Sequence, residues 1–261
     1  VTDGDTTNLS ATGTATILDD DGAPSISIND QTVNEDAGTI TFTVSLTNPS
    51  ASAVTVDYTS NNASATVGTD VTANDALSGT LTFAPGETSK TITLDVTNDD
   101  IYEISENFTI DLSGATNATI SDNQGVGTIN DEGSTPTTPN DKLGDAPTLS
   151  VGNASATEGG YETFTVSLSN ESTQNVSFDL TTATGTAAAT DYDAANMQVL
   201  VGGVWTNATS ATIAAGDTSV QVRVPTTLDT IDESDEQFTV TATVTDGDTT
   251  NLSATGTATI L

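Results

Sequence analysis

Residues 39–46 read Thr-Ile-Thr-Phe-Thr-Val-Ser-Leu, with an apolar side chain at every second position. This period of two is that of a strand with one face buried and the other in solvent. The same alternation recurs at residues 54–58, 92–96, 108–112, 164–168, 176–180, 220–224 and 238–242. The intervening Thr residues are β-branched and suit a pleated surface. Because patterns of helical period are almost absent, we expect an all-β fold of short antiparallel strands.

The composition of the chain excludes several classes of function. Its 261 residues include 37 Asp and Glu but only 3 Lys and Arg, which gives a net charge of −34, and there is no His or Cys. Disulfides, zinc sites with nitrogen or sulfur ligands, and catalysis by imidazole or thiolate are therefore excluded. Such an acidic chain would repel a phosphate backbone, so we expect no nucleic-acid partner.

Two further absences bear on the class of protein. No apolar stretch approaches the roughly 18 residues of a membrane span, so no direct membrane insertion is expected. The first residues lack the basic and then apolar order of a signal peptide. We single out no catalytic residue and expect that the protein is not an enzyme.

Internal repeats set the expected domain organisation. Residues 1–18 recur identically as residues 244–261, so we interpret residues 1–22 as the C-terminal hairpin of a preceding repeat. A weaker repeat relates the acidic run at residues 99–108 to that at residues 229–238. We therefore expect a domain at residues 23–132, a Pro-containing linker at 133–145, and a second domain at 146–261 that lacks its terminal Asp triplet. An insertion in the second half, around residues 197–205, is expected to form a longer strand pair.

Acidic residues gather where strands are expected to end. In the first half they are Glu35, Asp70, Asp99, Asp100, Glu103, Glu106, Asp131 and Glu132, and Asp19, Asp20 and Asp21 precede the domain. Alternate turns of a sandwich lie at the same pole, where these carboxylates would repel one another unless a cation intervened. Oxygen-only ligands suit Ca²⁺. The residues are equally compatible with solvated turns on a salt-adapted acidic surface.

One acidic run carries a family resemblance. Residues 98–108 read Asn-Asp-Asp-Ile-Tyr-Glu-Ile-Ser-Glu-Asn-Phe, and residues 83–92 read Phe-Ala-Pro-Gly-Glu-Thr-Ser-Lys-Thr-Ile. Together with Glu35 and the Gly68-Thr69-Asp70 motif, they resemble the Calx-beta domain over residues 24–132 and, more loosely, over residues 146–261. The resemblance implies tandem immunoglobulin-like β-sandwiches of antiparallel strands that bind Ca²⁺ at one pole.

The resemblance also implies a set of metal ligands. In the first domain they are Glu35, Asp70, Asp99, the Ile101 carbonyl, Glu103, Glu106 and Asp131, with Asp100 and Glu132 nearby. In the second domain they are Glu158, Asp191, Asp229, the Ile231 carbonyl, Glu233 and Glu236. Asn98 and Leu228 replace acids of the family pattern. Asp19, Asp20 and Asp21 represent the triplet that would follow Leu261, so the second site is expected to be incomplete.

The tandem repeats further resemble the extender region of large repetitive bacterial adhesins of the RTX type. This resemblance implies a secreted protein at the bacterial cell surface whose partners are neighbouring repeats, with Ca²⁺ stiffening the domain junctions for cell adhesion or biofilm formation. One alternative is a glycan- or protein-binding module that uses the loop at residues 202–205. Another is a Ca²⁺-sensing regulatory domain of a membrane protein.

Three weaker signals have two interpretations each. Tyr192 and Trp205 could form a sugar-stacking pair, although packing in the core or at an edge is the simpler interpretation. The Asp246-Gly247-Asp248 sequence fits a calcium loop, but fits a hairpin turn better. Glu103 and Glu106 could form the carboxylate pair of a glycosidase, yet clustered acids suit a metal better.

Overall fold

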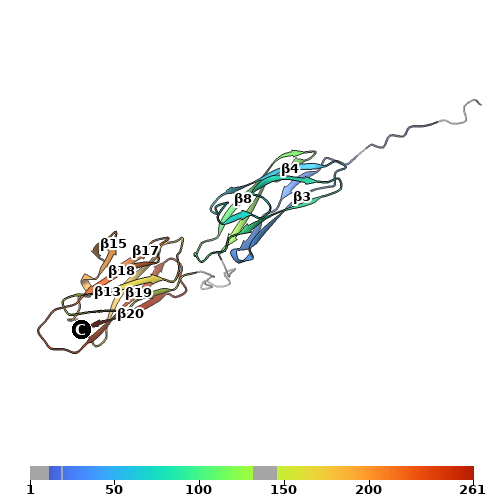
Figure 1. Ribbon diagram of the computed structural model, residues 1–261. Coiled ribbons are helices and arrows are strands. Elements are labelled where there is room, and N and C mark those ends of the chain that lie inside the picture. Colours follow the sequence, from blue (N-terminus) through green and yellow to red (C-terminus); the bar gives the residue numbers. More distant parts are fainter. Residues whose placement is uncertain (1–11, 19, 132–145) are drawn as a thin grey trace, which may run out of the picture.

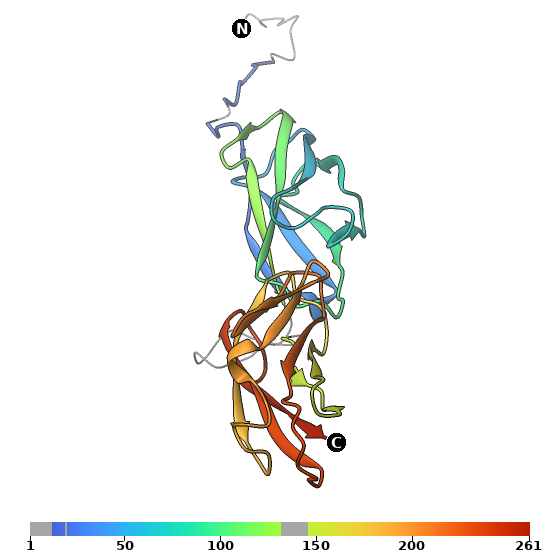
Figure 2. The ribbon, with the colours of Figure 1, turned by 90° about the vertical axis from the view of Figure 1, so that its left-hand side faces the viewer.

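The computed structural model describes residues 12–18, 20–131 and 146–261 of the chain. They form two β-sandwiches that follow one another end to end (Figures 1 and 2). Residues 12–18 lie outside any strand and are exposed, with Ile17 96% and Leu18 84% accessible to solvent. Among the described residues, no helix is both long enough and apolar enough to cross a bilayer.

The first sandwich contains two five-stranded sheets. Their strand orders are β5-β7-β3-β1-β9 and β2-β10-β8-β4-β6. The strands are β1 (Ser25–Ile28), β2 (Gln31–Asn34), β3 (Thr39–Leu46), β4 (Val54–Asn62), β5 (Val71–Ala73), β6 (Ser78–Phe83), β7 (Ser89–Val96), β8 (Glu106–Thr116), β9 (Thr119–Ile120) and β10 (Gln124–Asn130), and a 3₁₀ turn η1 (Glu35–Ala37) lies between β2 and β3. Most pairs are antiparallel, but β2 runs parallel to β10 and β1 runs parallel to β9.

The second sandwich repeats this arrangement. Its sheets have the orders β11-β13-β18-β15-β16 and β12-β20-β19-β14-β17. The strands are β11 (Leu149–Val151), β12 (Ala154–Ala156), β13 (Tyr161–Leu168), β14 (Val176–Thr184), β15 (Gln198–Val201), β16 (Val204–Asn207), β17 (Ser210–Ile213), β18 (Ser219–Pro225), β19 (Glu236–Asp246) and β20 (Ser253–Ile260), with a 3₁₀ turn η2 (Ala194–Asn196) before β15. Here β12 runs parallel to β20. The prediction of an all-β chain built as tandem sandwiches is confirmed.

The alternating strands bury their apolar face between the two sheets of each sandwich. In β3, every residue from Ile40 onward at even positions is buried. Phe42 meets Phe108 edge to face, with ring centroids 5.8 Å apart, and Phe164 meets Phe238 in the same way at 6.4 Å. Edge-to-face contact is favourable for aromatic quadrupoles. Each sandwich therefore has its own core.

The insertion in the second half forms the β15–β16 hairpin at the edge of a sheet. Arg223 of β18 reaches across β15 and lies between two aromatic rings, 3.9 Å from the centroid of Tyr161 and 4.2 Å from that of Trp205. Its Nε also donates to the Gln198 side-chain oxygen at 2.8 Å. These contacts tie the edge hairpin to strands β13 and β18 of the same sheet.

Candidate metal centres

The first acidic cluster is assembled at one pole of the first sandwich. Glu35 comes from η1, Asp70 from the loop before β5, and Asp131 from the chain just after β10. The β7–β8 loop supplies Asp99 and Glu103, and β8 begins with Glu106. Mutual electrostatic interactions join the six carboxylates Glu35, Asp70, Asp99, Glu103, Glu106 and Asp131. The fold therefore brings together the acids that the sequence singled out from five separate positions along the chain.

Backbone N–H groups orient three of these carboxylates. The Ile101 N–H donates to Asp99 Oδ1 at 2.8 Å, which closes a tight turn in the acidic loop. The Glu103 N–H donates to Asp131 Oδ2 at 3.2 Å, and the Thr66 N–H donates to Asp70 Oδ2 at 2.7 Å. The geometry of the loop is thus set by the main chain.

Burial raises the free energy of the ionised carboxylates in the first cluster. Glu35 is only 6% exposed, and its Oε2 is buried without a hydrogen-bond partner. Burial, followed by the charges of Glu103, Asp131 and Asp99, raises the pKa of Glu35 to about 8. Burial and the charges of Glu103 and Asp70 raise the pKa of Glu106 to about 7, and burial with the charges of Asp70 and Asp99 raises the pKa of Glu103. The ionised cluster calls for a compensating charge.

The donor set fits a calcium ion. All of the ligand candidates are oxygens, and the chain has no His or Cys to favour a transition metal. Ca²⁺ accepts six to eight oxygens in irregular geometry. The unpartnered oxygen of Glu35 is the kind of buried acceptor that such an ion satisfies.

The second acidic cluster lies at the corresponding pole of the second sandwich. Carboxylate oxygens of Glu158, Asp229 and Glu233 lie within 4.8 Å of one another, as do those of Asp191, Glu233 and Glu236. The Ile231 N–H donates to Asp229 Oδ1 at 2.7 Å, as Ile101 does to Asp99. The two acidic loops therefore have the same turn.

The electrostatics of the second cluster are milder. A shared hydrogen bond with Asp191 raises the pKa of Glu236, and desolvation followed by the charges of the neighbouring carboxylates raises that of Glu233. The pKa of Asp191 is lowered: burial opposes the change, but hydrogen bonds from the Ala188 N–H and from Glu236 outweigh it. Both Asp229 and Glu233 are exposed.

Several predicted ligands lie elsewhere or cannot be placed. The contact described for Asp100 is through its carbonyl, which accepts from the Asn170 amide at 3.1 Å. Asp20 and Asp21 are exposed, and Asp21 lies beside Gly22 and Asn48 at the other end of the first sandwich. Asp19 and Glu132 fall outside the described residues. Ile101 and Ile231 were predicted to bind metal through their carbonyls, whereas the hydrogen bonds described for them are those of their N–H groups.

The second cluster also differs in its ligand positions. The Gly160 N–H donates to the Thr157 carbonyl at 3.2 Å, just as the Gly38 N–H donates to the Glu35 carbonyl at 3.2 Å. Strand register matches Val33, which pairs with Ile129, to Ala156, which pairs with Ile260, so Glu158 corresponds to Glu35 in a turn that is one residue shorter. No described residue of the second cluster takes the place of Asp131.

Two important residues were not singled out from the sequence. Glu162 is fully buried at the second position of β13, where β3 has Ile40, and its Oε2 has no hydrogen-bond partner. A Glu at an inward position of an alternating strand was the available signal. Tyr102 is 6% exposed in the acidic loop, and its hydroxyl donates to Asp248 of the second domain at 2.8 Å; nothing in the sequence pairs these two residues.

The structure also decides two of the weaker signals. Tyr192 stacks on Phe238 inside the core, with centroids 4.1 Å apart, and Trp205 lies against Arg223. The sugar-stacking pair of Tyr192 and Trp205 is therefore wrong, and packing is correct. Asp246 ends β19 and Gly247 adopts φ +87 in the turn that leads to β20, as a hairpin requires.

Comparisons with known proteins identify the family of the chain. The solved structures that resemble it include the apo form of the Calx CBD1 domain (23% identity, 42% of this chain and 99% of that one, TM-score 0.38). They also include CBD12 from CALX1.2 (17% identity, 84% and 79%, TM-score 0.40). No curated protein matched the chain. The family profile described as the Calx-beta domain matches residues 19–133 and 145–261, so the chain belongs to the Calx-beta domain family, as two tandem copies.

Proposed function

We propose that this chain is a calcium-binding structural module whose acidic poles take up Ca²⁺. The observation that carries the proposal is the first cluster, in which the buried, unpartnered Oε2 of Glu35 belongs to one of six interacting carboxylates. Calx-beta domains are known as calcium-binding domains, and the second cluster offers a smaller set of oxygens. Glu35, Asp70, Asp99, Glu103, Glu106 and Asp131 would hold the first ion or ions.

Calcium would act on the loop that joins the two domains. The β7–β8 loop carries Asp99 and Glu103 toward the cluster and presents the Asp100 carbonyl and Tyr102 to the second domain. Neutralising the carboxylates would relieve repulsion within this loop. We infer that bound Ca²⁺ stiffens the junction between neighbouring domains.

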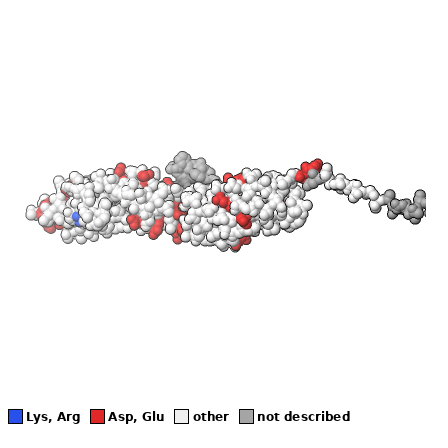
Figure 3. Space-filling view, turned by 90° about the horizontal axis from the view of Figure 1, so that it is seen from above, with Lys and Arg blue, Asp and Glu red and all other residues white. Residues whose placement is uncertain are grey.

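The larger role that fits this module is that of an extender in a secreted bacterial surface adhesin. Its support is the repetition of residues 1–18 as 244–261, the end-to-end sandwiches, and the acidic surface (Figure 3). Figure 3 shows acidic side chains gathered around the middle of the two-domain body. In this role the partners are neighbouring repeats, the module is not catalytic, and Ca²⁺ keeps the array extended from the cell.

Calorimetric titration of the full chain tests the calcium proposal. Addition of Ca²⁺ should give a heat signal that saturates. The same concentration of Mg²⁺ should bind weakly, because Mg²⁺ demands tight octahedral geometry and sheds water reluctantly. Equal binding of both ions would instead indicate general screening of a chain with charge −34. The extender role predicts that antibodies to this chain label intact cells that produce the parent protein, and absence of labelling would contradict it.

A second candidate function has its own observation. A groove of about 900 Å³ lies in the second sandwich between the β15–β16 hairpin and strands β14 and β17, lined by Val201, Thr206, Ser210, Thr212 and Gln221 among others. Ligand sites of this size combine an apolar lining with a few polar groups, and the hydroxyls of this groove would orient a small polar ligand such as a sugar. A glycan array probed with the full chain tests this function, and a groove variant such as Thr212→Trp should abolish any signal.

A further inference from the structure

The β7–β8 loop of the first domain docks against the second domain through main-chain hydrogen bonds. The Tyr102 N–H donates to the Glu171 carbonyl at 3.0 Å, and the Thr173 N–H donates to the Tyr102 carbonyl at 2.9 Å. These bonds form a parallel β-bridge between Tyr102 and Ser172. The Asn170 amide adds its bond to the Asp100 carbonyl.

The side chain of Tyr102 completes this contact. Its ring is 6% exposed although Asp99, Asp100 and Ile104 of the same loop are exposed. Its hydroxyl donates to Asp248, a residue 146 positions away in the β19–β20 turn, at 2.8 Å. An aromatic residue with a hydroxyl suits such a contact, because it buries apolar area and satisfies one polar partner.

The surface that contacts Tyr102 is held together by hydrogen bonds within the second domain. The Gly216 N–H donates to the Ser172 carbonyl at 3.0 Å, and the Gln174 N–H donates to Ser172 Oγ at 3.0 Å. Gly247 packs so closely that a Cβ there would lie 2.5 Å from the Asn175 carbonyl oxygen. The receiving loop and the turn that carries Asp248 therefore form one packed unit.

The same receiving loop exists in the first domain. There the Gly86 N–H donates to the Ser50 carbonyl at 3.0 Å, and the Ser52 N–H donates to Ser50 Oγ at 3.1 Å. A groove of about 740 Å³ opens beside it, lined by Asn48, Pro49, Ser50, Ala51 and Asn117 among others. Residues 1–18, which precede this pole, repeat the last strands of the second domain, so the occupant that fits the groove is the acidic loop of a domain like the second.

That second acidic loop lacks the tyrosine. Its turn matches that of the first loop residue for residue, from Asp99 and Asp229 to Ile101 and Ile231. The next residue is Tyr102 in the first loop and the exposed Asp232 in the second. An aspartate would present a hydrated charge where the tyrosine buries a ring.

We propose that Tyr102 locks the first domain onto the second, and that a joint formed through Asp232 is unlocked, so that tandem copies alternate between rigid and flexible joints. The two joints would share the main-chain docking and differ in this one side chain. The hydrogen bonds described for Tyr102 run to Glu171, Thr173 and Asp248 and not to a carboxylate of the first cluster, although the charge of Asp131 acts on its hydroxyl. The lock therefore goes beyond the calcium proposal and does not require it.

Distance measurements between spin labels in the full chain test the lock. The chain has no Cys, so Thr82→Cys and Thr165→Cys, at exposed strand positions of the two domains, give one labelled pair. The parent should give a narrow distance distribution. Tyr102→Asp, which installs the residue of the second loop, should broaden it clearly, and Tyr102→Phe should broaden it less because only the hydroxyl is lost.

Asp232→Ala is the matched control at the equivalent position of the second loop, and it should leave the distribution unchanged. Each variant is measured in Ca²⁺ and in a chelator, with circular dichroism as the check of folding. If Tyr102→Asp is folded and as narrow as the parent in both buffers, the lock is overturned. If calorimetry finds no calcium binding, the calcium proposal fails while the comparison between parent and Tyr102→Asp still decides the lock.

Discussion

The two domains share a topology and an acidic-loop geometry, yet they bury their carboxylates in different places. In the first domain Glu35 lies under the acidic pole, 6% exposed and with a pKa of about 8. In the second domain the corresponding Glu158 lies in a shorter turn and is half-buried, and the acids of the pole are more exposed. The fully buried carboxylate there is Glu162, inside the core, with burial raising its pKa to about 7.

This difference shows that the number of acidic residues at two metal sites does not decide which site gains more from binding a cation. An exposed carboxylate is hydrated and repels neighbouring charges weakly. A buried carboxylate loses its hydration, so its free energy depends on the charges and hydrogen bonds of the groups around it. The first domain therefore gains most from a cation. The second domain contains a buried acid, Glu162, that is not part of its acidic cluster. The effects of Glu35 and of Glu162 can both be measured in the full chain.

The largest expected effect is on thermal stability in calcium. At a free Ca²⁺ concentration about a hundred times Kd, one site adds roughly 2.7 kcal/mol to the free energy of unfolding. For a domain of this size that corresponds to a Tm increase of about 10 °C or more. Calorimetric scans of the full chain in Ca²⁺ and in chelator should show a larger Tm increase for the first domain than for the second. Equal Tm increases for both domains would contradict the difference proposed between their sites.

Glu162→Ile should stabilise the second domain by about 1.5 kcal/mol near pH 7.5. It removes the buried unpartnered Oε2 and installs the residue type of Ile40, and this gain exceeds the loss of the 2.8 Å hydrogen bond from the Ala156 N–H to Oε1. The pKa of Glu162 is raised from 4.5 to about 7, so the folded state holds a proton that the unfolded chain releases. Its contribution is therefore present below pH 4.5 and is lost as the pH rises through 7.

Thermal scans of parent and Glu162→Ile between about pH 4.5 and 8 measure this effect. The parent's second-domain transition should fall with pH, and the variant should lose that slope. Glu162→Gln serves as a control that keeps a polar group in the core. A variant less stable than the parent above about pH 7 would show that the hydrogen bond from the Ala156 N–H outweighs the cost of the buried carboxylate.

Glu103→Gln should weaken calcium binding at the first cluster about tenfold, or roughly 1.4 kcal/mol. The change preserves size and removes one charge, so the stability of the calcium-free domain should stay equal or rise. Titration calorimetry of the full chain measures both quantities with parallel melts. Unchanged affinity would remove Glu103 from the ligand set.

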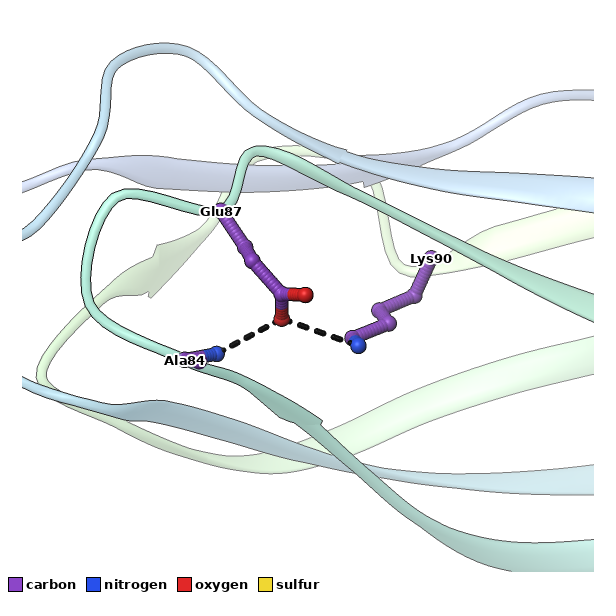
Figure 4. Close-up of polar contacts among 3 residues, drawn as sticks. All are labelled: Ala84, Glu87 and Lys90. Atoms are coloured by element: carbon purple, nitrogen blue, oxygen red, sulfur yellow. Dashed lines mark hydrogen bonds and ion pairs between the residues drawn. The ribbon is translucent and has the colours of Figure 1, made fainter.

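Glu87→Gln is the matched control for this variant. Glu87 accepts from the Ala84 N–H at 2.7 Å and pairs with Lys90 at 2.8 Å, in the turn that leads into β7 (Figure 4). The hydrogen bonds that Glu87 accepts from the Lys90 ammonium and from the Ala84 N–H lower its pKa. Since this turn lies at the opposite end of β7 from the acidic loop, the substitution should leave calcium affinity unchanged.

The smallest expected effect concerns the hairpin that only the second domain has. Arg223→Met removes the cation between Tyr161 and Trp205 and should lower the stability of the second domain by about 1 kcal/mol. The transition of the first domain should not move. Lys90→Met, which breaks a half-exposed ion pair, is the comparison and should have almost no effect.

Much of this architecture was predictable because alternation along the chain reports directly on which face is buried. The period of two at residues 39–46 and its counterparts predicts the strands, and the matched acidic runs predict two similar poles. The Tyr102–Asp248 contact was not predictable, because it depends on how two domains meet. Nor does sequence distinguish Glu35 from Glu158, since the depth of a carboxylate below its pole is set by a single-residue shift in the turn that carries it.

The parallel pairing of β2 with β10, and of β12 with β20, has a mechanical consequence. A pull on the two ends of a domain draws the start of the early strand and the end of the late strand in opposite directions. Parallel neighbours loaded in this way slide lengthwise, and the hydrogen bonds from residues 31–34 to residues 127–130 share the force together. An antiparallel pair opened from one end would instead lose its hydrogen bonds in succession. Under tension the lifetime of each domain is governed by its unfolding rate, and these two short ladders are the contacts that we expect to resist the force.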